Sequence, residues 1–302
     1  MKDKKVVFMG TPEFSLNVLE SLIENCNVIA VVTQPDKEVG RKKVLTMSPV
    51  KALALKHNIK VLQPRKLRNE YQDIIDLNPD VIITCAYGQI LPYELLSYPK
   101  YKTINVHASL LPKLRGGAPI QRAIMDGYKK TGVTIMRTEI GMDDGDMISS
   151  YEIEIKDDDT YETLSSKLSV IGKDLLIKTL PSIFDGTCKY IKQNEDEVTF
   201  AKIIKKEDEY LSFNDTTINI YNKIRGLCPE PCCYFNLDNE RVKVYNAKIG
   251  NSKASSYGKI TNISKEGLGI STNDGEIIIT KLQFKDYLNG IKKEDLINKK
   301  IN

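Results

Sequence analysis

Near its N-terminus the chain reads Val6-Val7-Phe8-Met9-Gly10-Thr11-Pro12-Glu13-Phe14, followed by an amphipathic stretch at residues 15–24. The apolar run at 6–9 is too short for the core of a signal peptide, so it predicts a buried strand. In the stretch after the turn, apolar residues recur at three and four positions, which is the spacing of a helix. A strand, a tight turn and a helix form the opening unit of an α/β sheet.

The turn between this strand and this helix has two interpretations. Backbone amides of a small-residue turn at the carboxyl edge of a sheet can face a ligand. Gly10 stands alone, however, and Pro12 has no amide hydrogen, so the GxGxxG fingerprint of dinucleotide-binding proteins is absent. A simple strand-to-helix turn remains as the alternative.

The same alternation continues through the first half of the chain. Short apolar runs predict further strands at residues 28–33, 60–63, 81–86, 103–106 and 133–139. Helical spacing predicts helices at residues 15–24, 48–57, 67–77, 93–96 and 160–184, and a loop entering a helix at 116–127. The expected fold is α/β, with a doubly wound, Rossmann-like parallel sheet.

A second domain is expected after a polar stretch. Asp185-Gly186 is expected to end the long helix, and residues 190–206 are interpreted as a linker between a catalytic domain at 1–189 and a C-terminal domain at 207–302. In the C-terminal domain a helix is expected at 216–226, followed by strands at 232–237, 242–249, 258–263, 267–271 and 275–282. Short strands separated by turns are typical of a small OB-like β-barrel.

Composition excludes several classes of protein. No apolar run approaches the roughly 20 residues that cross a bilayer, so no membrane association is expected. Six scattered cysteines and two histidines, His57 and His107, match no zinc-binding spacing, which predicts reduced thiols, no metal and a cytoplasmic location. The net charge of +4 lies in the last third of the chain, which fits either a polyanionic partner or an ordinary solvated surface.

A polar pair ends the strand predicted at 103–106. Side chains two residues apart on a strand leave the same face, so Asn105 and His107 are expected to converge at the edge where ligands bind in open α/β sheets. An amide and an imidazole there could stabilise the oxyanion of a tetrahedral intermediate and move a proton. A strand end capped by two polar side chains is the alternative.

An acidic loop follows the strand predicted at 133–139 and reads Gly141-Met142-Asp143-Asp144-Gly145-Asp146-Met147. A carboxylate from this loop beside His107 would help to keep the imidazole cationic. Asp residues also favour turns for their own backbone hydrogen bonds, and calcium loops are acidic too, but the rest of an EF-hand pattern is missing.

These segments together resemble the methionyl-tRNA formyltransferase family of folate-dependent formyltransferases. The resemblance rests on residues 10–14, 105–120 and 141–147, runs from about Val6 to Ile155, and continues more weakly to the C-terminus. It implies that Asn105 and His107 stabilise the tetrahedral oxyanion, while Asp143 orients and charges His107 and aids proton transfer. The folate contacts that it implies come from Ser109, Leu110, Leu111, Pro112, Gln89, Ile90 and Leu91.

The resemblance also implies a reaction and a partner. A monomeric cytoplasmic enzyme would transfer the formyl group of 10-formyltetrahydrofolate to the amino group of initiator methionyl-tRNA, giving N-formylmethionyl-tRNA for translation initiation. In this family a basic loop, here residues 34–43, lies against the tRNA acceptor stem. The tRNA-binding residues implied are Arg41, Lys42, Lys43 and Lys206.

Several alternatives remain at the level of sequence. Glycinamide ribonucleotide transformylase and sugar-nucleotide formyltransferases share the trio of Asn, His and Asp, and a formyltetrahydrofolate hydrolase would use water. A non-catalytic RNA-binding protein and a nicotinamide oxidoreductase come from other classes. The additional basic β-domain favours tRNA, because OB-like domains commonly bind oligonucleotides. The chain departs from the family in having no tryptophan, with Phe213 at one such position, so the family's C-terminal contacts are not carried over.

Overall fold

The structure is a computed structural model of the 302-residue chain, and it describes all residues except 41, 238–239, 253–255, 284–300 and 302. The chain forms two compact units. The first comprises Met1–Pro119, Thr131–Ile153 and Ser165–Ala201, and the second comprises Ile120–Lys130, Glu154–Leu164 and Lys202–Asn302. Within the described ranges, no helix is long and apolar enough to cross a membrane.

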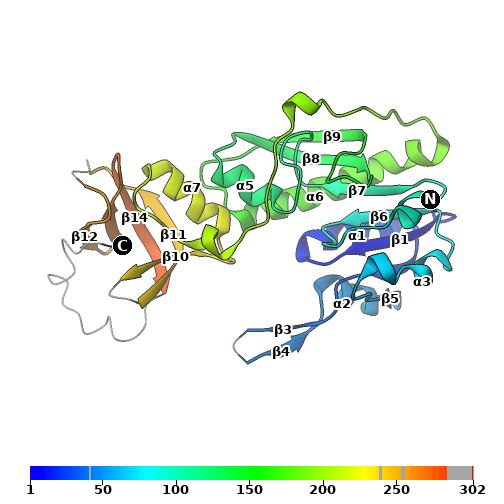
Figure 1. Cartoon of the computed structure of the whole chain (residues 1–302), viewed down its shortest axis with the longest axis horizontal. Coiled ribbons are helices and arrows are strands. Elements are labelled where there is room, and N and C mark those ends of the chain that lie inside the picture. Colours follow the sequence, from blue (N-terminus) through cyan, green and yellow to red (C-terminus); the bar gives the residue numbers. More distant parts are fainter. Residues whose placement is uncertain (41, 238–239, 253–255, 284–300, 302) are drawn as a thin grey trace. The chain divides into compact units, whose positions relative to one another are not determined.

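The first unit is built on a seven-stranded sheet with the strand order β5-β2-β1-β6-β7-β8-β9 (Figure 1). Its strands are β1 (Lys5–Gly10), β2 (Asn27–Val32), β5 (Lys60–Leu62), β6 (Val81–Cys85), β7 (Thr103–His107), β8 (Lys130–Arg137) and β9 (Met147–Glu154). The neighbouring strands β5, β2, β1, β6 and β7 are parallel to one another, whereas β8 is antiparallel to β7. The predicted Rossmann-like sheet is therefore confirmed, with an antiparallel extension at one edge.

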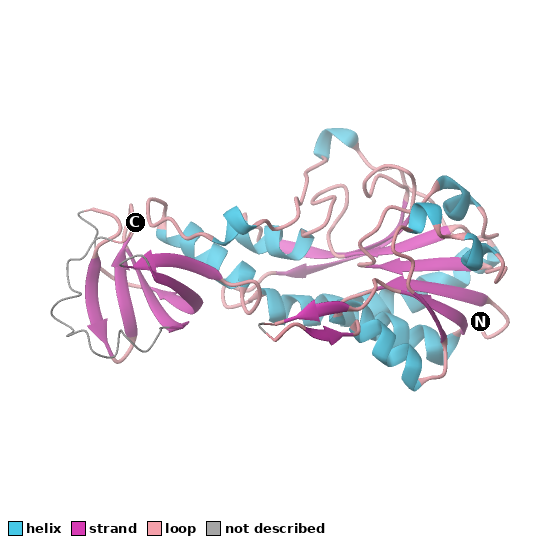
Figure 2. Cartoon of the chain, turned by 60° about the horizontal axis from the view of Figure 1, so that its bottom comes forward, coloured by secondary structure: helices cyan, strands magenta, loops and turns pink. Residues whose placement is uncertain are grey.

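Helices cover this sheet as the apolar spacing predicts. They are α1 (Leu16–Asn25), α2 (Pro49–Lys56), α3 (Gln72–Ile75), α4 (Tyr93–Ser97) and α6 (Tyr161–Asp185). Helix α5 (Pro119–Met125) belongs, apart from Pro119, to the second unit. Figure 2 shows helices gathered on one face of the sheet. Asn17 of α1 donates to the hydroxyl of Ser169 in α6 at 3.0 Å, which joins these two helices. Ser169 in turn donates to the carbonyl of Phe14 at 2.7 Å, so α6 is fixed to the turn after β1.

Two predicted elements differ from the structure. The helix predicted at 67–77 is broken into a 3-10 turn, Leu67–Asn69, and the short α3. Glu70 lies between them in a non-helical conformation, because its carboxylate accepts the backbone amides of Arg65 and Lys66 at 3.1 Å each. The predicted basic loop at 34–43 contains one strand of a hairpin, β3 (Lys37–Val39) paired with β4 (Val44–Thr46).

Packing of β1 against β6 accounts for a glycine at position 10. A Cβ atom at this position would lie 2.8 Å from the ring of Phe8 and 2.9 Å from the carbonyl oxygen of Cys85 in β6. Directly after the turn, the hydroxyl of Ser15 donates to that same carbonyl at 2.6 Å. Small residues here let the chain leave β1 while remaining in contact with β6.

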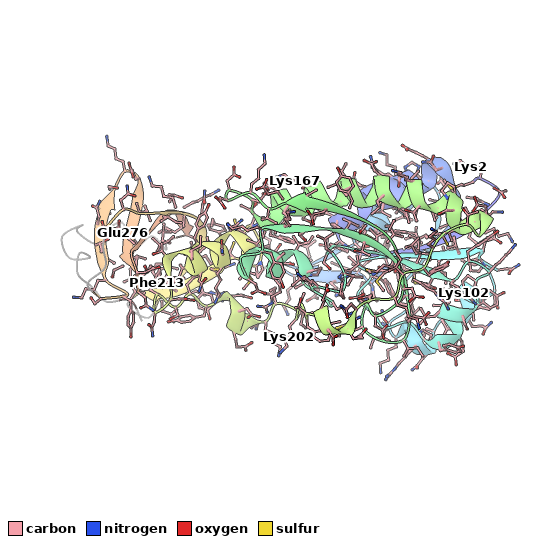
Figure 3. The ribbon with its side chains drawn as sticks, turned by 90° about the horizontal axis from the view of Figure 1, so that it is seen from above. Lys2, Lys102, Lys167, Lys202, Phe213 and Glu276 are labelled. Carbon is pink, nitrogen blue, oxygen red and sulfur yellow. The ribbon has the colours of Figure 1, made fainter. Side chains whose placement is uncertain are left out.

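The second unit contains the five strands predicted after residue 226, and they form one antiparallel sheet. Its order is β10 (Cys233–Leu237), β11 (Glu240–Ile249), β14 (Glu276–Gln283), β13 (Gly267–Ser271) and β12 (Ile260–Ser264). Helix α7 (Thr217–Leu227) packs its apolar side chains against this sheet. Phe213, labelled in Figure 3, is buried with its ring edge-on to Phe235 at 5.5 Å between centroids. Phe213 therefore serves the core of this unit.

Candidate active site

Asn105 and His107 lie on β7, and both belong to the same face of this strand because they are two residues apart. The hydroxyl of Thr84, on neighbouring β6, donates to Oδ1 of Asn105 at 2.9 Å. Since Oδ1 is occupied as an acceptor, the amide group of Asn105 presents its Nδ2 hydrogens in the other direction. The strand pairing therefore orients a hydrogen-bond donor at this point of the sheet.

His107 is buried, with 5% of its surface exposed, and each of its ring nitrogens faces an oxygen. Nε2 lies 3.0 Å from the carbonyl oxygen of Leu114, and a carbonyl can only accept, so Nε2 carries a hydrogen. Nδ1 lies 3.6 Å from Oδ2 of Asp143, which is within ion-pair distance but longer than a hydrogen bond. The structure thus brings His107 and Asp143 together, 36 positions apart in sequence, as the motifs predict.

Asp143 occupies a backbone conformation that non-glycine residues rarely adopt, with φ of 49°. Its Oδ2 accepts the backbone amide of Gly116 at 2.8 Å, so the acidic loop is joined to the loop that follows β7. Gly145 allows the loop to pass close to β8, since a Cβ atom there would clash with the carbonyl oxygen of Arg137. The carboxylate is therefore held by the backbone on both sides of the site.

The first folate-binding segment inferred from sequence, residues 109–112, is held by hydrogen bonds to β8. The hydroxyl of Thr134 donates to the carbonyl of Ser109 at 2.7 Å and accepts the amide of Leu111 at 3.2 Å. The hydroxyl of Ser109 donates to the carbonyl of Lys113 at 2.6 Å. Ser109 is buried, whereas Leu110 is partly exposed, so these bonds present Leu110 rather than Ser109 to solvent.

The second such segment, residues 89–91, follows β6. The side chain of Gln89 accepts the amide of Leu67 at 2.8 Å and donates to the carbonyl of Pro64 at 3.1 Å. Ile90 is 81% exposed, and Leu91 packs against an apolar cluster that includes Leu67 and Leu95. Gln89 therefore shapes the segment, while Ile90 offers an apolar surface that a flat ring could cover.

The residues predicted to contact tRNA lie in both units. Lys42 and Lys43 are exposed at the turn of the β3–β4 hairpin, and Nζ of Lys43 lies 4.0 Å from Glu38. Arg41 lies outside the described residues. Lys206 is an exposed residue of the second unit, in the 3-10 turn Lys206–Glu209.

Residues 191–201, expected from sequence to form part of the linker at 190–206, contact the loops of the site. Their backbone pairs with both loops of the site: Ile191 exchanges two hydrogen bonds with Met147, and Ala201 donates to the carbonyl of Arg115 at 2.7 Å. The amide of Arg115 donates to the carbonyl of Thr199 at 2.9 Å. These contacts join residues about 45 and 85 positions apart, and no local pattern in the sequence could indicate them.

Two cavities occur elsewhere in the first unit. One of 390 Å³ is lined by Lys100, Tyr101, Lys102, Ile183, Phe184, Asp185, Gly186 and Tyr190. Another of 290 Å³ is lined by Ile148, Ser149, Ser150, Leu175, Lys178, Thr179, Ser182, Cys188 and Lys189. Neither includes the three candidate catalytic residues. Across the described part of the chain, no three His, Cys, Asp or Glu side chains are grouped as they would be to hold a metal ion.

Comparison with known proteins gives a consistent result. The family model described as formyl transferase matches residues 4–180, and the model of the formyl transferase C-terminal domain matches residues 203–292. The chain is 47% identical over 280 residues to a protein of Staphylococcus aureus (strain JH1) named methionyl-tRNA formyltransferase, covering 92% of this chain and 90% of that protein. It is 51% identical over 284 residues to a protein of the same name from Bacillus thuringiensis subsp. konkukian (strain 97-27), with the same coverage.

Solved structures share the fold at lower sequence identity. An N-formyltransferase from Helicobacter canadensis, in complex with folinic acid and dTDP-3-aminofucose, has a TM-score of 0.68 and 23% identity, covering 93% of this chain and 99% of that chain. HypX from Aquifex aeolicus in complex with tetrahydrofolic acid has a TM-score of 0.63 and 16% identity, covering 94% of this chain and 44% of that chain. At these identities the likeness concerns the fold alone.

Proposed function

The chain belongs to the formyltransferase family, and from this membership we propose that it formylates methionyl-tRNA. It would transfer the formyl group of 10-formyltetrahydrofolate to the free amino group of initiator methionyl-tRNA, giving N-formylmethionyl-tRNA and tetrahydrofolate for translation initiation in the cytoplasm. The observation that carries the choice of acceptor is similarity along 92% of the chain, including the C-terminal domain, to relatives with that name.

Three side chains of β7 and the acidic loop would carry the chemistry. The neutral amine forms a bond to the formyl carbon, the bond from that carbon to the folate nitrogen breaks, and the proton lost by the amine ends on the folate nitrogen. The Nδ2 hydrogens of Asn105 and the Nε2 hydrogen of His107 would stabilise the oxyanion that forms between these steps, each donor being worth about 3 kcal/mol of barrier. Nε2 would exchange the Leu114 carbonyl for this oxyanion.

Asp143 would act on His107 rather than on the substrate carbon. With Nε2 donating to an oxygen, the second ring nitrogen faces the carboxylate at 3.6 Å. A proton on Nδ1 makes that contact attractive, and a lone pair there makes it repulsive, so Asp143 favours the imidazolium that stabilises an oxyanion. The same carboxylate could order a water that carries the proton from the amine to the leaving nitrogen.

Folate and tRNA would lie on the loops described above. Residues 109–112 and 89–91 would contact the folate, with the exposed side chain of Ile90 as an apolar surface for the pterin ring. Arg41, Lys42, Lys43 and Lys206 would contact tRNA phosphates. Such contacts position a tRNA and depend on salt, but do not read its sequence. A metal ion has no part in this proposal.

The test is transfer of labelled formyl from 10-formyltetrahydrofolate, assayed with initiator and elongator methionyl-tRNA side by side. We expect label on the initiator tRNA and its loss in His107→Ala, while His57→Ala, in the residue after α2, keeps wild-type activity. Amino-sugar nucleotides, glycinamide ribonucleotide and water serve as alternative acceptors. Label on one of these and none on tRNA would replace the proposed acceptor, and tight tRNA binding without any turnover would identify a binding protein instead.

A further inference from the structure

Gln193 connects the acidic loop with the loop that follows β7, and we propose that it is a positioning residue for the formyl transfer. By holding the backbone at Asp143 and Gly145, it would keep the Asp143 carboxylate beside His107. The inference rests on the proposed function, because it assigns Gln193 to the reaction in which those two residues act.

Every polar group of the Gln193 side chain has a partner. Its Nε2 donates to the carbonyl oxygen of Asp143 at 2.7 Å and to that of Gly145 at 2.8 Å. Its Oε1 accepts Nε of Arg115 at 2.9 Å. Carbonyls only accept and a guanidinium only donates, so the amide group fits in one orientation. A carboxylate at this position could accept from Arg115 but could not donate to the two carbonyls. The residue is 9% exposed, so water does not substitute freely for these bonds.

The segment that Gln193 holds needs such support. Asp143 has a left-handed backbone, which costs an L-residue free energy and persists only when the surroundings fix it. The loop also contains Gly141 and Gly145, which leave the backbone with more freedom than other residues would. One amide group bonded to both Asp143 and Gly145 fixes the two ends of this turn at once.

Arg115 closes the connection into a ring. Its guanidinium is buried, with 4% of the residue exposed, and pairs with Gln193 and with Glu195 at 2.7 Å. The next residue, Gly116, donates its amide to the Asp143 carboxylate at 2.8 Å. The path from Asp143 through Gly116, Arg115 and Gln193 therefore returns to Asp143, and it fixes the carboxylate through both its side chain and its backbone.

The variant that separates positioning from folding is Gln193→Glu. A carboxylate still accepts Nε of Arg115, so the buried guanidinium keeps a partner, but it cannot donate to the two carbonyls. We expect kcat to fall about 100-fold with both KM values within about twofold of wild type, as for a displacement on the order of 1 Å at a reacting group.

Two further variants complete the experiment. Gln72→Glu makes the same chemical change at an exposed residue of α3, and it should match wild type in both kcat and KM. Gln193→Met also lacks both N–H donors, so it replaces Gln193→Glu if that variant fails to unfold cooperatively, and the same loss of kcat is expected. Thermal unfolding of each variant shows which one is folded.

A wild-type kcat in a folded Gln193 variant would overturn this inference while leaving the proposed function intact, provided that His107→Ala is inactive in the same assay. Failure of the wild-type protein to formylate any of the amines would instead remove the proposed function and, with it, this role of Gln193. A drop in kcat accompanied by equal loss in Gln72→Glu would also count against a specific positioning role.

Discussion

At the scale of single residues, Asp143 is placed between two loops, with one carboxylate oxygen shared by an amide and an imidazole. Asp143→Asn can still accept the Gly116 amide, so the loop should stay in place, but the charge beside His107 is lost. We expect kcat for methionyl-tRNA to fall at least about 100-fold with little change in KM. Steady-state kinetics of Asp144→Asn, the same change one residue along, should resemble wild type. An unaltered kcat in Asp143→Asn would remove this carboxylate from the mechanism.

A second residue-scale prediction concerns Tyr87, a buried phenol whose hydroxyl has no hydrogen-bond partner among the described residues. Tyr87→Phe removes this unpaired polar group, so the free energy of unfolding at neutral pH should rise by about 1 kcal/mol. Burial, and to a smaller extent the Glu70 charge, raises the pKa of Tyr87. The stability of the wild type is therefore retained below the ordinary phenol pKa of about 10 and falls above it, and this alkaline loss should be smaller in the variant.

Urea unfolding at about pH 7 and about pH 10.5 measures both effects. Tyr98→Phe is the control, because the Tyr98 hydroxyl is exposed and donates to Asn78 at 3.2 Å, so its removal should bring no gain. A loss of stability in Tyr87→Phe would mean that the hydroxyl has a partner in solution.

At the scale of secondary-structure elements, the β3–β4 hairpin projects apolar and basic side chains together. Val39, Val44 and Leu45 are exposed on its strands, and Lys42 and Lys43 lie at its turn. If the lysines contact tRNA phosphates, Lys42→Ala or Lys43→Ala should each lower the slope of log Kd against log salt by about 1 and leave kcat unchanged. Filter-binding titrations at several salt concentrations measure the slope. Lys56→Ala, at the exposed end of α2, is the control, and equal slopes in all proteins would place the hairpin away from tRNA.

The strands that sequence predicts best are those whose residues are almost all buried. Strands β1 and β6 are apolar on both faces, and their sequence runs show it directly. Strand β9 was not predicted, because at the sheet edge it is mostly half-buried or exposed and its polar residues follow no clear alternation. The prediction of one helix at 67–77 was wrong for a different reason. The Glu70 carboxylate accepts the backbone amides of Arg65 and Lys66, and the spacing of apolar residues carries no information about such bonds.

In the candidate site too, some residues could be predicted from sequence and others could not. Asn105, His107 and Asp143 could be chosen from sequence because their segments resemble known motifs, and the structure brings the last two within 3.6 Å. Gln193 could not be chosen, since a lone glutamine in a polar stretch has no local signature. Its significance depends on bonds to residues about 50 and 80 positions away.

At the scale of the whole molecule, the second unit is assembled from three separate stretches of chain. Arg225 of α7 joins two of them, donating to the carbonyls of Lys156 and Asp159 at 3.2 and 2.8 Å from a buried position. Arg225→Met should lower the free energy of unfolding by about 3 kcal/mol, because buried carbonyls lose charged donors. Arg241→Met, which removes a more exposed pair with Glu209, should cost no more than about 1 kcal/mol. Chemical unfolding measures both, and equal costs would contradict the joining role of Arg225.

This interleaving has a consequence for exchanging modules between enzymes. A graft that swaps only the chain after Ala201 would carry over α7 and the β-sheet but leave behind 120–130 and 154–164, which belong to the same compact unit. The arginine of the grafted segment that corresponds to Arg225 would then have to bond to the carbonyls that the recipient protein has at positions 156 and 159. The grafted α7 would likewise have to pack on the recipient's α5. Recombination, in the laboratory or in evolution, should therefore tolerate an exchanged C-terminal segment only when residues 120–130 and 154–164 are exchanged with it or are already the same in both proteins.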